Sequence, residues 1–334
     1  ELAAAEMEDY DALVHKLPAL KLNYEIGSGF FGIVFLEKVQ IREMESPALW
    51  AVKRIAKDVP YFPIRRYQEE VKNLQALSKV SFYEWFIQFY DTCEDLHCTY
   101  IAMEYIPIGD MLKTFVNGYR WNESDTKVVI KQLLQGLAVM HQEGITHRDL
   151  KPENIFLSLS MNETQSLHVK VGDFGTSKHI PLLNASTCLK TTTGTSSYMA
   201  SEMLDRSKHK TNRVDIWSLG RILYRMSAGS PLFKDLFELY RYAATASAPP
   251  LALENRGLSP TCVKFLRDVL QPTSEDRPSA EACLENSWIV NDVPRSQYSI
   301  GKDLSTRLFK IKLGAPDIDS LSDVVTDLEP ITLS

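Results

Sequence analysis

The most constraining feature of this sequence is the octapeptide His147–Asn154, which reads HRDLKPEN. Asp149 offers an acceptor for a hydroxyl proton, Lys151 a cation for phosphoryl oxygens, and Asn154 an oxygen ligand for Mg²⁺. The alternative is an ordinary charged turn, since Asp, Asn and Pro are common in turns. We interpret the octapeptide as a loop for phosphoryl transfer, and we expect the rest of the chain to present it.

Composition bounds the class of protein. The chain has 334 residues, of which 44% are hydrophobic and 24% charged, so it can bury a large core in one two-lobed domain or in two domains. The net charge of −6 argues against a nucleic-acid partner. Since the chain begins at Glu1 and not at Met, we expect it to be a piece of a longer protein.

Cysteine usage and hydropathy point to the cellular setting. The five cysteines contain no C-x-x-C pair, which disfavours both a disulfide framework and a zinc site. No run of about 18 apolar residues occurs, so no membrane association is expected. These features predict an intracellular protein of the cytoplasm, the nucleus or both.

A glycine-rich motif, Gly27-Ser28-Gly29-Phe30-Phe31-Gly32-Ile33-Val34, lies between two stretches of alternating apolar residues. The pattern predicts a strand, a glycine turn and a second strand. Glycines let a backbone approach phosphates closely and donate N–H groups to them. A dinucleotide-binding fold uses a similar motif but needs a helix directly after the glycines. The β-branched and aromatic residues that follow Gly32 make this alternative the weaker one.

Lys53 ends the next apolar strand, where an internal lysine is costly unless it is paired. Residues 67–77 have apolar side chains at helical spacing, and Glu70 lies just before that apolar face. We therefore predict that Glu70 pairs with Lys53, with Glu69 as the fallback. The alternative for either glutamate is an exposed position on an amphipathic helix.

The second half of the chain supplies a further carboxylate. A strand predicted at 99–103 leads into a connector with Pro107 and Gly109, which marks a boundary between a β-rich and a helical part. The next helix begins at Asn122 or Ser124 and ends at Gly144. A later strand at 167–171 delivers Gly172-Asp173-Phe174-Gly175, where Asp173 offers a second oxygen ligand for Mg²⁺. The Ser- and Thr-rich stretch 176–201 is long enough to suggest a functional segment.

Taken in order, these motifs resemble the eukaryotic protein kinase superfamily over roughly 22–290. The matching positions are Gly27, Gly29, Gly32, Lys53, Glu70, His147, Arg148, Asp149, Asn154, Asp173, Phe174, Gly175, Glu202, Asp215 and Arg277. The resemblance implies an α+β, bilobal fold, with a β-rich N-lobe that carries one main helix and a mainly α-helical C-lobe. The expected divisions are an extension at 1–21, the N-lobe at 22–106, the C-lobe at 107–290 and a tail at 291–334.

The resemblance also implies a site for ATP and Mg²⁺. Lys53, paired with Glu70, would hold the α- and β-phosphates, Asp149 would accept the substrate hydroxyl proton, and Lys151 would neutralise the γ-phosphate. Asn154 and Asp173 would hold two Mg²⁺ ions. The residues implied to contact the nucleotide are Gly27, Ser28, Gly29, Gly32, Val34, Ala51, Lys53, Met103, Glu104, Ile106, Asp110 and Phe156. Among these, Met103 would lie at the back of the adenine pocket and Asp110 near the ribose.

The substrate class follows from the same resemblance. Lys151-Pro152-Glu153 looks like the serine/threonine branch, which implies Ser and Thr hydroxyls of protein substrates. Asp110 and Glu153 imply attraction to a basic residue upstream of the phosphorylated one, as in the calmodulin-dependent and checkpoint-kinase-like branch. Thr191 matches the family's activation-loop phosphosite, with Thr192 and Thr193 as rivals, and implies an upstream activating kinase. Thr195 would support Asp149 and Lys151.

Three departures from the family pattern stand out. Ala200-Ser201-Glu202 replaces Ala-Pro-Glu, the interval from Lys53 to Glu70 is short, and the aromatic stretch Ser81–Phe89 lacks the usual His-Pro-Asn turn. None removes a catalytic group. The alternative from another functional class is a pseudokinase scaffold that binds nucleotide or partners without phosphotransfer. A small-molecule kinase is disfavoured, because the segment 194–202 resembles a platform for protein substrates.

Overall fold

The computed structural model describes residues 20, 22–29, 32–39, 47–57, 64–78, 82, 84–160, 166–175, 177–179, 197–203, 210–245, 257–291 and 298–316. Contacts divide these residues into two compact units. The first takes its described residues from Glu1–Tyr83, Ile87–Pro107 and Gly314–Ser334, and the second from Glu84–Phe86 and Ile108–Leu313. The predicted fold class is confirmed, since the first unit is built on an antiparallel sheet and the second is mainly helical.

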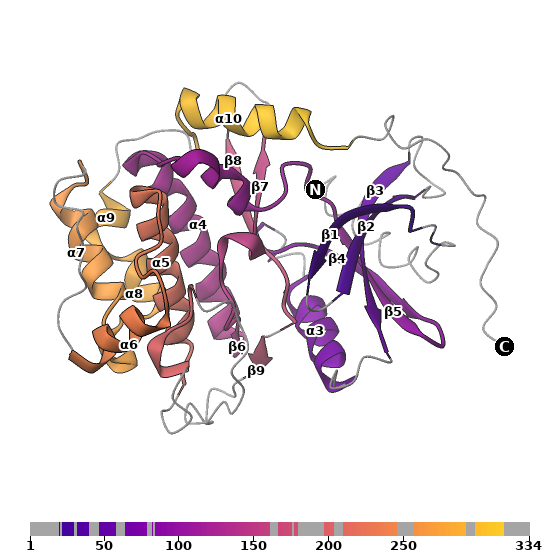
Figure 1. Ribbon diagram of the computed structural model, residues 1–334, viewed down its shortest axis with the longest axis horizontal. Coiled ribbons are helices and arrows are strands. Elements are labelled where there is room, and N and C mark those ends of the chain that lie inside the picture. The colour runs from indigo at the N-terminus through magenta and orange to yellow at the C-terminus, as the bar shows by residue number, and fades with distance from the viewer. Residues whose placement is uncertain are drawn as a thin grey trace, which may run out of the picture. The chain divides into compact units, whose positions relative to one another are not determined.

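The sheet of the first unit has five strands in the order β1-β2-β3-β5-β4 (Figure 1). The strands are β1 (Tyr24–Gly29), β2 (Gly32–Val39), β3 (Ala48–Ala56), β4 (Phe89–Glu94) and β5 (Cys98–Glu104). The predicted glycine hairpin is present, with Gly29 opposite Gly32. Gly32 has a φ of 132°, and a Cβ there would collide with the carbonyl oxygen of Arg54. This position therefore requires glycine.

Alternation along β3 gives the sheet two different faces. Trp50 and Val52 are buried in a core cluster with Val39 and Ala102. The residues between them point to the opposite face, because successive side chains of a strand alternate. Lys53, the residue after Val52, belongs to that opposite face. The strand continues three residues beyond the end that the sequence predicts at Lys53.

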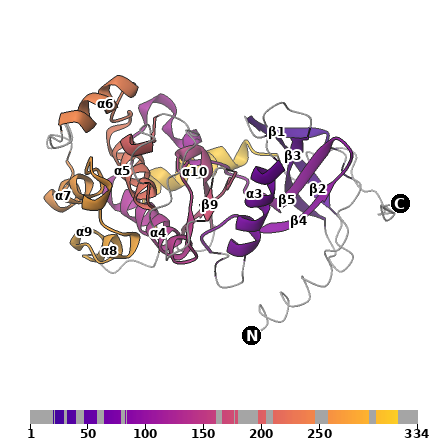
Figure 2. The same cartoon turned by 90° about the horizontal axis from the view of Figure 1, so that it is seen from below.

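Helix α3 (Ile64–Leu77) packs against the sheet of the first unit through β4 (Figure 2). Leu74 and Leu77 are buried, as expected from the apolar spacing of this segment. Glu70, four residues before Leu74, is buried on the same side of the helix, whereas its neighbour Glu69 is exposed. Adjacent residues on this helix thus face different surroundings.

The second unit is built around α4 and α5, which lie side by side (Figure 1). Its helices are α4 (Glu123–Gln142), α5 (Arg213–Ala228), α6 (Leu236–Thr245), α7 (Pro260–Val269), α8 (Ala280–Leu284), α9 (Ser287–Val290) and α10 (Lys302–Leu313). Short 3-10 helices are η2 (Met111–Gly118), η3 (Pro152–Asn154), η4 (Ser201–Met203) and η5 (Ser274–Asp276). Two antiparallel ribbons pair β6 (Ile145–Thr146) with β9 (Lys178–His179) and β7 (Ile155–Leu159) with β8 (Leu167–Val171). No helix in the described ranges combines the length and apolar character needed to cross a membrane.

The ends of α4 follow the predicted signals. The side chain of Asn122 accepts the N–H of Asp125 at 2.8 Å and caps the helix start, so Asn122 and not Ser124 is the cap. After the helix, Gly144 has a φ of 74°, the left-handed conformation that favours glycine. The chain turns sharply there and enters β6, directly before the octapeptide.

Part of the aromatic stretch that lacks the His-Pro-Asn turn, Glu84–Phe86, belongs to the second unit. The N–H of Val171 donates to the carbonyl of Trp85 at 2.8 Å, and Phe86 forms an isolated bridge with Val171. The ring of Phe86 lies edge-on to Phe174, with centroids 6.0 Å apart. Phe86 therefore packs against Phe174, next to Asp173.

Part of the stretch that the sequence assigns to a tail is folded. Helix α10 contacts β7 and η2 (Figure 1). Arg307 donates to the carbonyls of Thr114 and Val116 at 3.1 and 2.9 Å, and the N–H of Gly301 donates to Asp125 at 2.7 Å. The second unit thus includes residues well beyond 290.

Candidate active site

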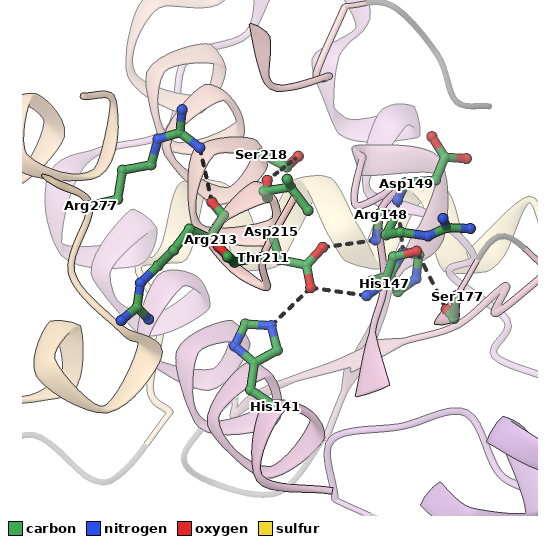
Figure 3. A network of polar contacts seen from close by, with 11 residues as sticks. His141, His147, Arg148, Asp149, Ser177, Thr211, Arg213, Asp215, Ser218 and Arg277 are labelled. Carbon is green, nitrogen blue, oxygen red and sulfur yellow. Dashed lines mark hydrogen bonds and ion pairs between the residues drawn. The ribbon is translucent and has the colours of Figure 1, made fainter. Parts of the chain in front are cut away.

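A buried carboxylate holds the octapeptide in place. Asp215 on α5 accepts the backbone N–H of His147 at 2.9 Å and that of Arg148 at 2.8 Å, and the Nε2 of His141 lies 2.9 Å away (Figure 3). Asp215 is fully buried, and Arg148 has a φ of 67°. A non-glycine residue is strained in this left-handed conformation, so the two hydrogen bonds offset a local cost. The Asp149 side chain points away from this network (Figure 3).

The electrostatics of Asp215 favour its ionised form. Burial alone would raise the pKa of this carboxyl group, but the hydrogen bond and charge of His141, the charge of His147 and the hydrogen bond from Arg148 outweigh burial. The net effect is a pKa below the ordinary value for aspartate. Asp215 is therefore a charged acceptor at neutral pH, and hydrogen bonds to charged acceptors are the stronger kind.

His147 joins the octapeptide to the strand that carries Asp173. Its Nδ1 accepts the N–H of Asp149 at 3.3 Å, so the proton of a neutral ring resides on Nε2, which donates to the carbonyl of Gly172 at 3.1 Å. The ring also contacts Phe174, at 5.4 Å between centroids. The imidazole is fully buried. It acts as a spacer between two segments rather than as a group that meets substrate.

Asp149, Lys151 and Asn154 lie together on one short stretch. The Lys151 ammonium is 2.8 Å from the Asp149 carboxylate. The side-chain amide of Asn154 donates to the backbone carbonyl of Asp149, also at 2.8 Å. With its N–H₂ group used in this way, Asn154 presents its amide oxygen to its other neighbours. The stretch thus offers a carboxylate, a cation and a neutral oxygen within a few residues.

Asp173 is brought to the same end of the β7–β8 ribbon as Asn154. Ile155 pairs with Val171, and the N–H of Gly172 donates to the Asn154 carbonyl at 3.0 Å. Asp173 follows with a φ of 57°, a second strained non-glycine position in the same area. The amide oxygen of Asn154 and the carboxylate of Asp173 are hard donors of the kind that Mg²⁺ prefers, and Mg²⁺ usually takes few protein ligands. The residues present fit this metal.

In the first unit, Lys53 pairs with Glu70. Their charged atoms are 2.6 Å apart, and both residues are buried, at 7% and 3% exposure. The predicted pairing is present, and the fallback Glu69 is exposed. Lys53 lies opposite Val34, and Ala51 lies opposite Met103. Because facing residues of neighbouring strands share a face, as do residues two apart on a strand, these four side chains lie on one face of the sheet.

The other residues implied to contact the nucleotide are divided between the two units. In the first unit, Glu104 exchanges hydrogen bonds with Gln88, donating its N–H at 2.9 Å and accepting at 3.2 Å, and Ile106 is buried. In the second unit, Asp110 forms an isolated bridge with Phe156. Burial raises the pKa of the Asp110 carboxyl group, against the opposing charge of Lys113. The phosphosite candidates Thr191, Thr192 and Thr193, and the supporting Thr195, lie outside the described residues.

Two supporting residues were not singled out in the sequence. His141, in the last turn of α4, contacts Asp215. Gln132, in the middle of α4, donates to the Leu167 carbonyl at 2.9 Å and accepts the Val169 N–H at 3.0 Å, which fixes β8. The one available signal was their position among apolar residues on a helix face that packs inward, since a polar side chain there needs a partner.

Glu202, the residue kept from the family's Ala-Pro-Glu segment, pairs with Arg277. Arg277 donates to both carboxylate oxygens of Glu202, at 2.5 and 2.9 Å. It also donates to the carbonyls of Gln271 and Pro272, at 2.7 and 3.0 Å, and its guanidinium lies 4.8 Å from the Trp217 ring centroid. The replacement of Pro by Ser201 leaves this buried pair in place.

Comparison with known families decides the assignment. The family model described as "Protein kinase domain" matches residues 20–289. The chain belongs to the protein kinase domain family. The protein kinase match covers both units and includes the octapeptide, the glycine hairpin and Asp173, while α10 lies beyond it.

Several curated protein kinases are similar to this chain. CDPK-related kinase 8 of Arabidopsis thaliana is 36% identical over 275 residues, which are 81% of this chain and 43% of that protein. The probable myosin light chain kinase of Dictyostelium discoideum is 30% identical over 279 residues, 81% of this chain and 83% of that protein. Serine/threonine-protein kinase cds1 of Schizosaccharomyces pombe is 32% identical over 287 residues, 80% of this chain and 58% of that protein. The chain spans about half the length of the CDPK-related relatives, 43% and 52% for the first two.

Proposed function

We propose that this chain is a serine/threonine protein kinase that transfers the γ-phosphoryl group of ATP to Ser and Thr hydroxyls of protein substrates, with Mg²⁺. The observation that carries the proposal is the grouping of Asp149, Lys151, Asn154 and Asp173 at one end of the β7–β8 ribbon. A carboxylate base, a cation and two oxygen donors are what this reaction asks of a protein. Membership of the protein kinase family supports the same reading.

The role of Asp149 follows from its contacts. Its carboxylate would accept the proton of the attacking hydroxyl and orient the oxygen toward the γ-phosphorus. Lys151, 2.8 Å from that carboxylate, would neutralise charge that develops on the phosphoryl oxygens. The hydrogen bonds that the backbone N–H groups of His147 and Arg148 donate to Asp215 would hold the Asp149 backbone in a fixed position during the reaction.

Asn154 and Asp173 are the proposed ligands of Mg²⁺. The metal, when bound, supplies charge neutralisation of the ATP phosphates. The chain contributes the fixed position of the two donors. Asn154 is oriented by its hydrogen bond to the Asp149 carbonyl, and Asp173 by the backbone bond between Gly172 and Asn154.

Lys53 is the proposed contact for the α- and β-phosphates. Its pairing with Glu70 fixes the ammonium group on the face of the sheet that also carries Val34, Ala51 and Met103. These apolar side chains are suited to contact the adenine ring, and the strand edge at Glu104 and Ile106 to recognise its polar atoms. Asp110 and Phe156, which form an isolated bridge, are also proposed to contact the nucleotide.

The choice of Ser and Thr as acceptors rests on Lys151 in the octapeptide and on the names of the relatives, among them serine/threonine-protein kinase cds1. We propose in addition that an upstream kinase activates the chain by phosphorylating Thr191 or a neighbouring threonine. Phosphate at this position would add negative charge and hydrogen-bond acceptors that Arg148 could bind.

The test is phosphate transfer from radiolabelled ATP with Mg²⁺ to an arrayed library of Ser- and Thr-containing peptides, run beside an Asp149→Asn variant. We expect transfer by the unaltered chain and loss of transfer in the variant, with unchanged thermal unfolding. Nucleotide binding without transfer to any peptide or to a generic protein acceptor such as casein would favour the pseudokinase scaffold. Transfer that persists in Asp149→Asn would show that another group or a contaminant performs the reaction.

A further inference from the structure

One face of helix α5 carries two arginines toward Tyr198. Ser218, Arg221 and Arg225 follow one another at intervals of three and four residues, which places them on the same side of the helix. The Ser218 hydroxyl donates to the carbonyl of Tyr198 at 3.0 Å, so this side faces the segment that leads into Glu202. Tyr198 is buried, with 6% exposure.

Arg221 is a buried cation whose charge is poorly compensated. It is 2% exposed, and its guanidinium lies 4.5 Å from the ring centroid of Phe233. Its Nη1 has no hydrogen-bond partner among the described residues. Burial lowers the pKa of this arginine to about 10, which still leaves it charged at neutral pH. A stacked aromatic ring offsets only part of the cost of burying a guanidinium.

Two further side chains beside Tyr198 have unused hydrogen-bonding atoms. Within the described ranges, the Nε of Arg225 and the Oε2 of Glu153 are buried without a partner. The pKa of Tyr198 is raised to about 12, first by burial, with Arg225 and Arg221 lowering it and Glu153 raising it. The charges of all three side chains therefore act on this one phenol. We call Glu153, Tyr198, Arg221 and Arg225 the Tyr198 cluster.

The charge balance of the Tyr198 cluster indicates which ligand would complete it. Two guanidinium groups and one carboxylate leave one positive charge, in surroundings where an uncompensated charge is costly. Buried polar atoms in native proteins nearly always have partners, so several unpartnered atoms in one place indicate a group that binds there. Two guanidiniums and a phenol are donors, and a carboxylate is the side chain that accepts from them most strongly.

We propose that Arg221, Arg225 and Tyr198 form a subsite for an acidic side chain of the protein substrate. The proposal rests on the proposed kinase function. Glu153 and Arg225 are half-buried and thus partly accessible, whereas Tyr198 and Arg221 are buried. Glu153 stands four residues after Asp149, so the two are at most about 14 Å apart along the chain. An extended peptide that places its hydroxyl at Asp149 therefore reaches the cluster within about four residues.

This inference differs from the upstream basic preference suggested by Asp110 and Glu153 in the sequence. Each of those carboxylates has a cation of this chain close by. The charge of Lys113 acts on Asp110. The charges of Arg225 and Glu153 both act on the phenol of Tyr198, so Arg225 is the cation close to Glu153. A lysine or arginine of a substrate would compete with these resident cations and add a second like charge to the Tyr198 cluster. An acidic side chain would meet neither obstacle.

The experiment measures kcat/KM for a set of peptides that carry one Ser with four alanines on each side. In each peptide one of the eight alanines is kept or is replaced by Glu or Lys. We expect one position at which Glu exceeds Lys by about ten-fold or more. Arg225→Glu should lower that Glu-to-Lys ratio by about ten-fold or reverse it, and Glu153→Gln should raise it. Lys264→Glu, the same change of charge at an exposed position of α7, should leave the ratio unaltered.

Two results would overturn the inference. Equal turnover of Glu, Ala and Lys peptides at every position would show that the cluster does not read substrate charge, and a preference for Lys that Arg225→Glu leaves unchanged would assign recognition to other residues. If Arg225→Glu fails to fold, Glu153→Gln and the unaltered chain decide the question alone. Absence of transfer to any peptide would instead overturn the proposed function, and the inference with it.

Discussion

The buried carboxylate of Asp215 accepts the backbone N–H of Arg148 at 2.8 Å, across 67 positions of sequence. Together with its bond to His147, this contact fixes the octapeptide from behind, while Asp149 faces the other way. The catalytic loop thus owes its conformation to a residue of α5 rather than to its own turn sequence. Four predictions test this contact and the contacts related to it.

Replacing Asp215 with asparagine should destabilise the protein. The amide nitrogen of asparagine would face one of the two backbone donors and leave at least one buried N–H without an acceptor. The free energy of unfolding should fall by about 1–3 kcal/mol or more, because the lost acceptor is charged. Urea denaturation at pH 7 measures the difference. Asp268→Asn, at an exposed pair with Lys264, is the control and should stay within about 0.5 kcal/mol of the unaltered chain. Equal effects of the two changes would contradict the structural role.

The contribution of Asp215 should depend on pH. Its folded-state pKa is depressed, so its stabilisation is fully present above the unfolded pKa of about 3.9 and is lost as the pH falls through the folded value. The difference in unfolding free energy between the unaltered chain and Asp215→Asn should therefore be constant from pH 7 to 5 and shrink below about pH 4. Urea titrations at a series of pH values measure it. A difference that widens on acidification would argue for a raised pKa instead.

Lys53 and Glu70 should behave as one unit in catalysis. Glu70→Gln removes the charge that holds the Lys53 ammonium at 2.6 Å, and Lys53→Met removes the ammonium itself. Each should lower kcat/KM for ATP by about ten-fold or more, and the double variant should cost no more than the worse single one, because both changes remove the same interaction. Steady-state kinetics measure this. The matched control is Glu69→Gln at the exposed neighbour. Its kcat/KM for ATP should stay within about two-fold of the value for the unaltered chain.

The bidentate pair of Arg277 and Glu202 should be essential to stability. Arg277→Met leaves the buried carboxylate of Glu202 without its cation, which typically costs about 3–5 kcal/mol. Arg277→Lys should recover only part of that loss, since an ammonium cannot reproduce two parallel bonds. In the double variant Glu202→Leu with Arg277→Met, the cost should be smaller than the sum of the two single changes. Denaturation midpoints of the unaltered chain, the three single variants and the double variant measure these effects, and strict additivity would show that the two side chains act independently.

Local sequence patterns were sufficient for the elements and for the order of the site residues. The glycine hairpin, the cap at Asn122 and the turn at Gly144 all follow from short-range rules on glycine and capping residues. The pairing of Lys53 with Glu70 was predictable because a lysine inside a strand demands a partner and a helix follows nearby.

The contacts that sequence reasoning did not supply are those between segments far apart in the chain. The attachment of Trp85 and Phe86 to the strand before Asp173 joins residues that share no periodic pattern. Arg221 lies in a helix that reads as apolar core, and its burial beside Tyr198 depends on how α5 meets the segment at 197–203. Periodicity tells which face of a helix turns inward, but not which distant residue it meets.

Helix α10 has a practical consequence for how this protein is handled. The family match ends at residue 289, yet Leu304 and Leu308 are fully buried and Arg307 donates to two carbonyls of η2. A fragment trimmed at the family border would uncover the apolar surface beneath α10 and leave those carbonyls to water. The smallest stable recombinant piece of the second unit is therefore expected to extend through Leu313, and fragments shortened to residue 289 should express poorly or aggregate.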